Sequence, residues 1–91
     1  MFRVTEQCAS GRFTLKLEGR CSSDVIGELD AGFQAAMLKA SHGVIWVDLS
    51  DVSLVDAAGV EQLARMHQAG ARFVARGCFM RELKREICES H

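Results

Sequence analysis

Hydrophobic and polar positions alternate at the beginning of the chain, first over residues 2–8 and again over residues 12–18. A period of two is typical of β-strands that are buried on one face only. The Ser10-Gly11 dipeptide between the two segments predicts a tight turn. We therefore expect the chain to open with a β-hairpin, whose second strand ends at Gly19.

Three later segments carry apolar residues at spacings of three and four, which predicts amphipathic helices. The first covers residues 24–40 and begins near three candidate N-cap residues, Ser22, Ser23 and Asp24. The second begins after Asp56, which is also a candidate N-cap. The third lies near the end of the chain. The apolar stripes of the three helices consist of Ile26, Leu29, Phe33, Met37 and Ala40; of Val60, Leu63, Ala64 and His67; and of Phe79, Met80, Leu83 and Ile87.

Two short apolar runs separate these helices. Residues 44–47 are apolar without alternation and rich in β-branched and aromatic residues. Such a run is typical of a strand that is buried on both faces, in the centre of a sheet with parallel neighbours, and Trp46 is accordingly expected in the core. Residues 50–55 are expected to form an exposed loop, and residues 73–75 a fourth strand. The element order is then β-β-α-β-α-β-α, and a right-handed crossover makes the third and fourth strands parallel.

The composition indicates a single globular domain over residues 1–91. Hydrophobic residues make up 48% and charged residues 25%, as in an ordinary folded domain, and the formal net charge is −1. A chain this close to neutrality has no global field that would gather nucleic acid or an anionic membrane. It also contains neither an apolar run of about 18 residues nor the pattern of a signal peptide. We therefore expect a cytoplasmic protein that binds no nucleic acid and inserts into no membrane.

The cysteines form no C-x-x-C pair, so neither a zinc ribbon nor a thioredoxin-like site is indicated. Without an export signal we expect reduced thiols, although four cysteines could also form two disulfides. Cys88 and His91 have a metal-ligand spacing, but two ligands at the end of a chain do not make a metal site. We therefore expect no bound metal. The four cysteines are Cys8, Cys21, Cys78 and Cys88.

Enzyme motifs are absent from the sequence, including the phosphate-binding G-x-x-x-x-G-K loop, the G-x-S-x-G nucleophile turn and the H-E-x-x-H zinc motif. We therefore expect no catalysis and no cofactor. A remote alternative is a thiol-based sensor or small enzyme, because Cys21 lies near the start of the first helix and a helix N-terminus lowers the pKa of a thiol. His67 is expected at the edge of the core, with one ring nitrogen bonded.

The most specific pattern lies in residues 44–60. There an apolar strand is followed by Asp48-Leu49-Ser50, a short apolar segment, and Asp56-Ala57-Ala58-Gly59-Val60 at the start of a helix. This order resembles the signature of the STAS family, which comprises anti-sigma factor antagonists and related domains. The segment from Leu15 to Gly19 also resembles the end of the family's second strand. The resemblance implies an α/β fold with a four-stranded mixed sheet and about three helices packed mainly on one face.

The same resemblance implies a bacterial protein-interaction domain of signal transduction or transcription regulation, which works by docking and not by catalysis. The implied partner is an anti-sigma factor or a kinase-like protein. The alternative is a non-catalytic accessory subunit of the ATPase of an ABC-type lipid transporter. The two functions differ in the partner that the chain would bind, and a homodimer is compatible with either.

The family's phosphorylation site is changed in this chain. In the regulated antagonists, a partner kinase phosphorylates the second hydroxyl residue of a D-[ST]-[ST]-G motif, where the phosphate meets the free N–H groups of a helix N-terminus. Ala57 and Ala58 occupy the two hydroxyl positions here. We therefore expect no phosphorylation at Ala58. Ser50 and Ser53 are the neighbouring hydroxyls, and whether another kinase modifies them stays open beside their ordinary role in turns and caps.

We place the docking surface on residues 50–55 and the first turns of the second helix. Because the apolar stripe of that helix faces the sheet, Glu61, Gln62 and Arg65 are expected to point outward or sideways. Gly59 allows two interpretations: its small size lets another backbone come close, or it simply tolerates packing of the preceding loop. The expected partner-binding residues are Asp51, Ser53, Asp56, Ala57, Ala58, Gly59, Glu61, Gln62 and Arg65.

Overall fold

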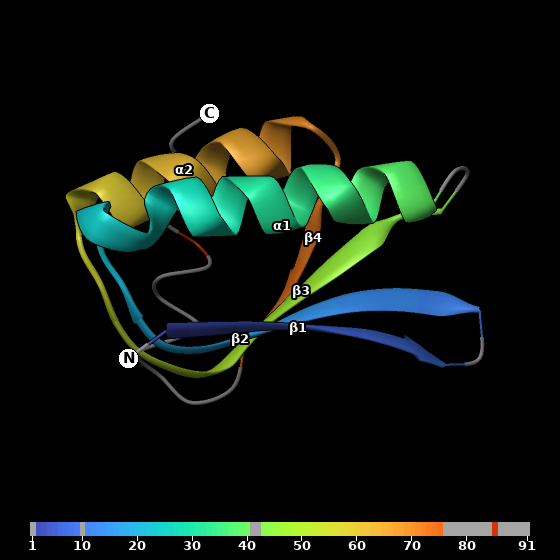
Figure 1. Cartoon of the computed structure of the whole chain (residues 1–91), viewed down its shortest axis with the longest axis horizontal. Coiled ribbons are helices and arrows are strands. Elements are labelled where there is room, and N and C mark those ends of the chain that lie inside the picture. The colour runs from blue at the N-terminus through green and yellow to red at the C-terminus, as the bar shows by residue number, and fades with distance from the viewer. Residues whose placement is uncertain (1, 10, 41–42, 76–84, 86–91) are drawn as a thin grey trace.

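The structure is a computed structural model that describes residues 2–9, 11–40, 43–75 and 85 (Figure 1). Its elements are β1 (Phe2–Ala9), β2 (Arg12–Cys21), the 3₁₀ turn η1 (Ser23–Val25), α1 (Ile26–Lys39), β3 (Ile45–Val55), α2 (Ala57–Gln68) and β4 (Arg72–Val74). The four strands form one sheet in the order β1-β2-β3-β4. β1 and β2 are antiparallel, whereas β3 is parallel to both of its neighbours. The predicted four-stranded mixed sheet is therefore confirmed.

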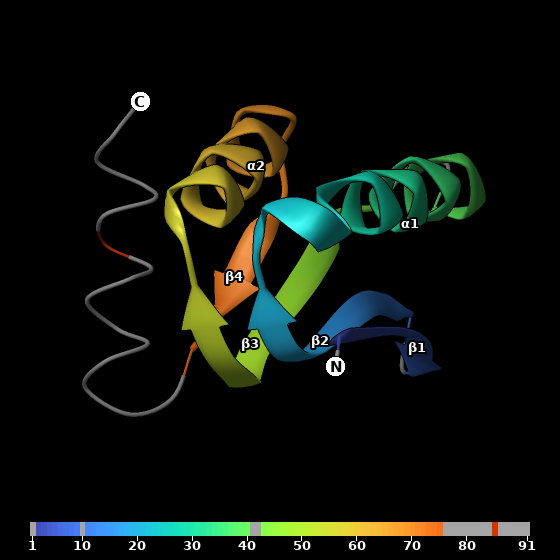
Figure 2. The same ribbon diagram turned by 60° about the vertical axis from the view of Figure 1, so that its left-hand side comes forward.

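Both helices cover the same face of the sheet, with α1 over the side of β1 and β2 and α2 over the side of β3 and β4 (Figures 1 and 2). Most residues of the predicted apolar stripes of these helices are buried or half-buried and meet the strand residues that point toward them, but Met37 of the α1 stripe is exposed. Removing such side chains from water contributes about 25 cal/mol per Å² of apolar surface, so this layer holds the helices on the sheet. The largest fully buried side chains are Leu15, Leu17, Cys21, Leu29, Val47, Leu49, Leu63 and Met66.

The opening hairpin is confirmed, but the prediction that its second strand ends at Gly19 is wrong. Gly19 has a φ of 94°, and the register of β2 against β3 shifts in its neighbourhood. A glycine in the left-handed region lets a strand pass through a bulge instead of stopping. β2 therefore continues to Cys21, which pairs with Val55 at the end of β3.

The prediction of an exposed loop over residues 50–55 is also wrong. These residues belong to β3, which spans eleven residues. The bulged extension of β2 provides a parallel partner for the second half of β3. Strand preference depends strongly on the neighbours that a segment finds, and here backbone pairing holds a segment of mixed polar and apolar residues in a strand.

β3 lies between two parallel neighbours in the centre of the sheet, as predicted. Its first half is not buried on both faces, however, because only alternate side chains point toward the helices. Trp46 lies on the other face, with the guanidinium carbon of Arg12 at 3.7 Å from its ring centroid. This distance is that of a cation–π contact. Trp46 is half-buried and is therefore not the core residue that we expected. The buried residues are Ile45, Val47 and Leu49, and the half-buried ones are Trp46, Asp48 and Ser50.

The predicted third helix, with the stripe Phe79, Met80, Leu83 and Ile87, lies outside the described residues. β4 begins at Arg72, one position earlier than the strand predicted over residues 73–75. Within the part of the chain that the structure describes, no helix has the length and apolar character needed to cross a membrane.

Hydrogen exchange tests the central position of β3. Because β3 lies between two strands and β1 lies at the edge of the sheet, the amides of residues 45–49 should exchange at least about tenfold more slowly than those of β1. Amide exchange followed by NMR measures both strands in one sample. Equal rates in the two strands would contradict the sheet order.

Candidate functional site

Asp56 fixes the point at which α2 begins. Its Oδ1 accepts a hydrogen bond from the backbone N–H of Gly59 at 2.8 Å, and its extended backbone conformation is that of an N-cap residue. The predicted N-cap is therefore confirmed, and such a cap stabilises a helix by about 1 kcal/mol. The second carboxylate oxygen, Oδ2, accepts from the backbone N–H of Ser23 at 3.0 Å. The same side chain thus joins the starts of α2 and η1.

The backbone of Asp56 is held as well, because its N–H donates to the carbonyl oxygen of Cys21 at 3.2 Å. Gly59 lies against this same carbonyl. A Cβ added at Gly59 would lie 2.5 Å from the Cys21 oxygen and 2.7 Å from Cγ1 of Val55. Of the two interpretations of Gly59, close approach of another backbone is therefore correct, and the approaching backbone is the end of β2 in the same chain.

Cys21 is a buried part of this junction. Its side chain is fully buried, and burial raises the pKa of its thiol to about 11, with a smaller contribution from the negative charge of Asp56. The expectation that a helix N-terminus lowers this pKa is wrong here, because desolvation of the thiolate dominates. Cys8 is an exposed free thiol, whereas Cys78 and Cys88 lie outside the described residues. Residues 2–9, 11–40, 43–75 and 85 contain no group of three side chains that could hold a metal ion.

Most of the expected site residues on α2 lie at its surface. Glu61 and Arg65 are exposed, as the helical periodicity predicts, and Ala57 is exposed and Ala58 half-buried. Gly59 is buried beneath the end of β2. These positions place small, neutral side chains at the N-terminal end of α2 and charged ones in its second and third turns.

The prediction that Gln62 points outward or sideways is wrong, because its exposed fraction is only 3%. Helix α1 packs beside α2 on the same sheet face (Figure 2), and its Asp30 reaches this position. The amide Nε2 of Gln62 donates to Oδ1 of Asp30 at 3.1 Å, and its Oε1 accepts from Nη2 of Arg65 at 2.8 Å. Asp30 is the site residue that the sequence reasoning missed, since no local pattern connects two helices whose contacting residues are far apart in the chain.

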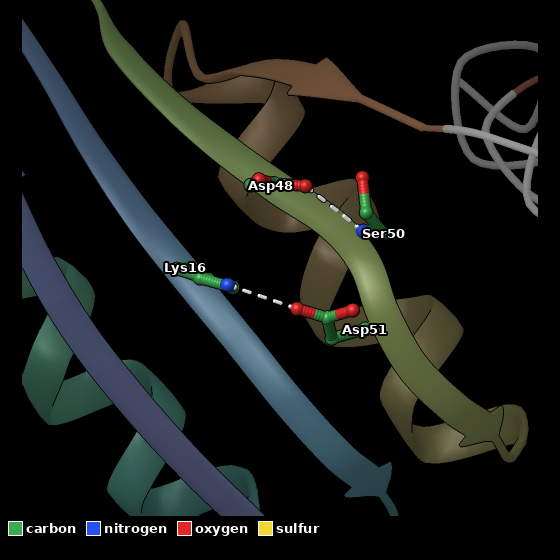
Figure 3. A network of polar contacts seen from close by, with 4 residues as sticks. All are labelled: Lys16, Asp48, Ser50 and Asp51. Carbon is green, nitrogen blue, oxygen red and sulfur yellow. Dashed lines mark hydrogen bonds and ion pairs between the residues drawn. The ribbon is translucent and has the colours of Figure 1, made fainter.

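The remaining two expected site residues, Asp51 and Ser53, are exposed positions of β3 and not of a loop. Asp51 forms an ion pair with Lys16 at 2.9 Å, and the two side chains join β2 and β3 in front of the sheet while α2 lies behind it (Figure 3). This contact raises the pKa of Lys16, through the hydrogen bond first and the charge of Asp51 second. The structure therefore separates Asp51 from the α2 residues with which it was grouped.

Ser50 and Ser53 differ in access. Asp48 accepts a hydrogen bond from the backbone N–H of Ser50 at 2.9 Å (Figure 3). The hydroxyl oxygen of Ser50 is buried and has no hydrogen-bond partner in the described part of the chain, whereas Ser53 is exposed. A modifying enzyme that approached this segment would therefore meet the hydroxyl of Ser53 and not that of Ser50.

The comparisons with known proteins agree with this fold. The family described as "Mlab, STAS domain" matches residues 4–83, and the chain belongs to this STAS family. A search of curated proteins found no match. The predicted family is therefore confirmed.

Solved structures share the fold at low sequence identity. An anti-sigma factor antagonist from Mycobacterium paratuberculosis is 21% identical, with a TM-score of 0.76 over 90% of this chain and 74% of that chain. The anti-sigma factor antagonist SpoIIAA in its unphosphorylated form is 16% identical, with a TM-score of 0.62 over 94% of this chain and 83% of that chain. A protein with a SpoIIAA-like fold from Shewanella loihica is 8% identical, with a TM-score of 0.60 over 92% of this chain and 75% of that chain. The α/β fold class is thereby confirmed.

The close approach at Gly59 has a direct test. Gly59→Ala should lower the free energy of unfolding by about 1–3 kcal/mol, because the new Cβ overlaps a backbone oxygen that can move only with β2. Urea unfolding followed by circular dichroism measures the change. The matched control is Gly27→Ala in α1, where an added Cβ meets no atom within 4 Å. That change should stabilise the protein by about 0.5–1 kcal/mol, and equal effects of the two variants would contradict the close approach.

Thiol labelling tests the environment of Cys21. At about pH 8, a maleimide should modify Cys8 rapidly and Cys21 only when the protein unfolds, because a buried thiol with a raised pKa provides almost no thiolate. Peptide mapping by mass spectrometry assigns the label to each cysteine. Rapid modification of native Cys21 would instead favour the thiol-sensor alternative.

Proposed function

We propose that this chain is a non-catalytic protein-interaction domain, similar in action to an anti-sigma factor antagonist, that binds its partner through the exposed side of α2. We call this surface the α2 docking face and define it by Ala57, Ala58, Glu61 and Arg65. The observation that carries the proposal is the anchored start of α2, where Asp56 and Gly59 fix a helix end whose first residue is exposed. We place this activity in the bacterial cytoplasm, in signal transduction or transcription regulation.

Rigidity supports a docking role for this surface. The helix end is tied to η1 and β2 through Asp56 and packed against β2 through Gly59. A surface that is already ordered loses less conformational entropy when it binds than a mobile loop does. In this proposal Asp56, Gly59 and Gln62 hold the shape, and the four residues of the α2 docking face make the contacts. Ser53 is an additional exposed position, and Asp51 belongs to the opposite face of the sheet.

The absence of a hydroxyl at the N-terminal end of α2 makes the proposed binding constitutive. Neither Ala57 nor Ala58 has an oxygen that could accept a phosphoryl group. Phosphorylation adds nearly two negative charges and can switch an interface off by repulsion. Since that change is chemically excluded at these positions, a kinase could not release the partner by acting on them.

This property also favours a second candidate, a non-catalytic accessory subunit of the ATPase of an ABC-type lipid transporter. A permanent subunit has no need of a reversible switch at its interface, which agrees with alanine at both positions. The two candidates use the same α2 docking face and differ in the partner. Capture from the native host followed by mass spectrometry distinguishes them, because one predicts an anti-sigma factor or kinase-like protein and the other a transporter ATPase.

The docking surface is tested by introducing charge at the N-terminal end of α2. Ala57→Glu should weaken binding of the captured and purified partner at least about tenfold, because a new carboxylate is desolvated at the interface. The fold should persist, since an acid in the first turn of a helix is favoured by about 0.3–1 kcal/mol. Titration calorimetry and circular dichroism on the same preparation measure both quantities.

The matched control is Gln34→Glu, which makes the same change in charge at an exposed position of α1. This variant should bind the partner like the unmodified protein. If Ala57→Glu also keeps full affinity, the partner does not use the α2 docking face and the proposal fails.

A further inference from the structure

Three polar side chains form a row that crosses from α1 to the surface of α2. Gln62 is in the middle and is the one buried polar side chain in the described part of the chain, with an exposed fraction of 3%. Its Nε2 donates to Oδ1 of Asp30 at 3.1 Å on one side. Its Oε1 accepts from Nη2 of Arg65 at 2.8 Å on the other. Asp30 and Arg65 are both exposed.

The two neighbours fix the direction of the Gln62 amide. In the observed orientation the NH₂ group faces a carboxylate and the carbonyl oxygen faces a guanidinium. The reversed orientation would place two donors together at Arg65 and two acceptors together at Asp30, with no bond at either end. The buried amide therefore holds Nη2 of Arg65 in one place, and leaving it unbonded would cost the desolvation free energy of a buried polar group.

The positive charge of Arg65 is not neutralised by this arrangement. Gln62 is uncharged, and the ion pairs within the described residues are Lys16–Asp51 and Lys39–Glu6. A guanidinium has five N–H donors in a planar fork, of which the bond to Gln62 uses one. Arg65 thus combines an exposed charge, which forms no ion pair within the described residues, with a side chain whose end is already positioned.

We propose that Arg65 determines the specificity of the α2 docking face by binding a carboxylate side chain of the partner protein, and that Gln62 is the positioning residue for its guanidinium. This inference rests on the proposed docking function and names the chemistry that one contact would recognise. A planar guanidinium matches a carboxylate in a bidentate geometry, and one that is held in advance loses less freedom on binding. Arginines of this kind are over-represented among the residues that dominate binding energy.

Glu61 restricts how a partner can be aligned along α2. It is exposed on α2 one turn before Arg65 and carries the opposite charge. A partner carboxylate would be repelled at Glu61 and attracted at Arg65. The pair therefore favours one register of the partner along α2 and disfavours a register shifted by one helical turn.

The test uses the partner captured with the unmodified chain, expressed and purified, in titration calorimetry against variants of the full chain. Arg65→Met should weaken binding at least about tenfold, and Arg65→Lys should recover part of the loss because it keeps the charge without the planar fork. Arg3→Met removes an exposed arginine from β1 and is the matched control, for which unchanged affinity is expected. Urea unfolding of each variant separates lost binding from lost stability.

Charge reversal identifies the class of the contacted group. Arg65→Glu should abolish measurable binding, and changing a single Asp or Glu of the partner to Arg should restore it. The role of Gln62 is tested in the free protein. Slow rotation of the Arg65 guanidinium should give separate NMR signals for its two Nη groups, and these signals should merge in the Gln62→Met variant. Gln62→Met should also weaken partner binding about two- to tenfold, which is less than the loss caused by Arg65→Met.

The outcomes separate this inference from the proposed function. If Ala57→Glu abolishes binding while Arg65→Met and Arg65→Glu bind normally, the docking face is correct and the role of Arg65 is wrong. If Arg65→Glu loses binding and no substitution of a partner acid restores it, a carboxylate is not the group that Arg65 contacts. If Gln62→Met lowers stability but leaves the NMR signals and the affinity unchanged, Gln62 only joins the two helices and the inference is overturned for that residue.

Discussion

The Asp56 carboxylate accepts hydrogen bonds from two backbone N–H groups of different elements, Gly59 of α2 and Ser23 of η1. Hydrogen bonds to an ionised acceptor are stronger than those between neutral groups, and a carboxylate has an oxygen for each donor. The backbone N–H of Asp56 is bonded to the end of β2 at Cys21. The starts of α2 and η1 and the end of β2 are therefore all bonded to a single residue, Asp56. This junction therefore fixes the geometry of the surface at the N-terminal end of α2.

Local patterns were sufficient to predict much of this arrangement. The hairpin, most of the apolar stripes of α1 and α2, and the N-cap at Asp56 are each specified by residues close in sequence, and the structure contains all of them. Alternation and helical periodicity indicate which side of an element faces the core. An N-cap side chain accepts a hydrogen bond from a backbone N–H about three residues later, so both groups lie in one short stretch of sequence. The exposed positions of Glu61 and Arg65 followed from the same periodicity.

The features that the sequence could not predict depend on contacts between distant segments. Gly19 was interpreted as a strand end, although its positive φ carries β2 through a bulge and so lengthens β3. Gln62 was placed at the surface because one helix considered alone does not show that α1 covers it. The raised pKa of Cys21 has the same origin, because its burial depends on the way β2, β3 and α2 meet. In each case a tertiary neighbour decides what a local pattern leaves open.

The chemistry of the proposed α2 docking face follows from the way these contacts distribute charge. The amides of Gly59 and Ser23 are occupied by Asp56, and alanine fills the two positions at which a phosphate would meet a helix N-terminus. The first turn of α2 can therefore contribute shape and apolar contact to an interface, but it cannot discriminate between partners by charge. That discrimination falls to the next two turns, where Glu61 and Arg65 have opposite signs. An internal amide that orients one of these two charges while remaining neutral itself then has a consequence beyond stability: in the proposed interface it leaves Arg65 without an internal ion pair and so able to contact a charged group of the partner.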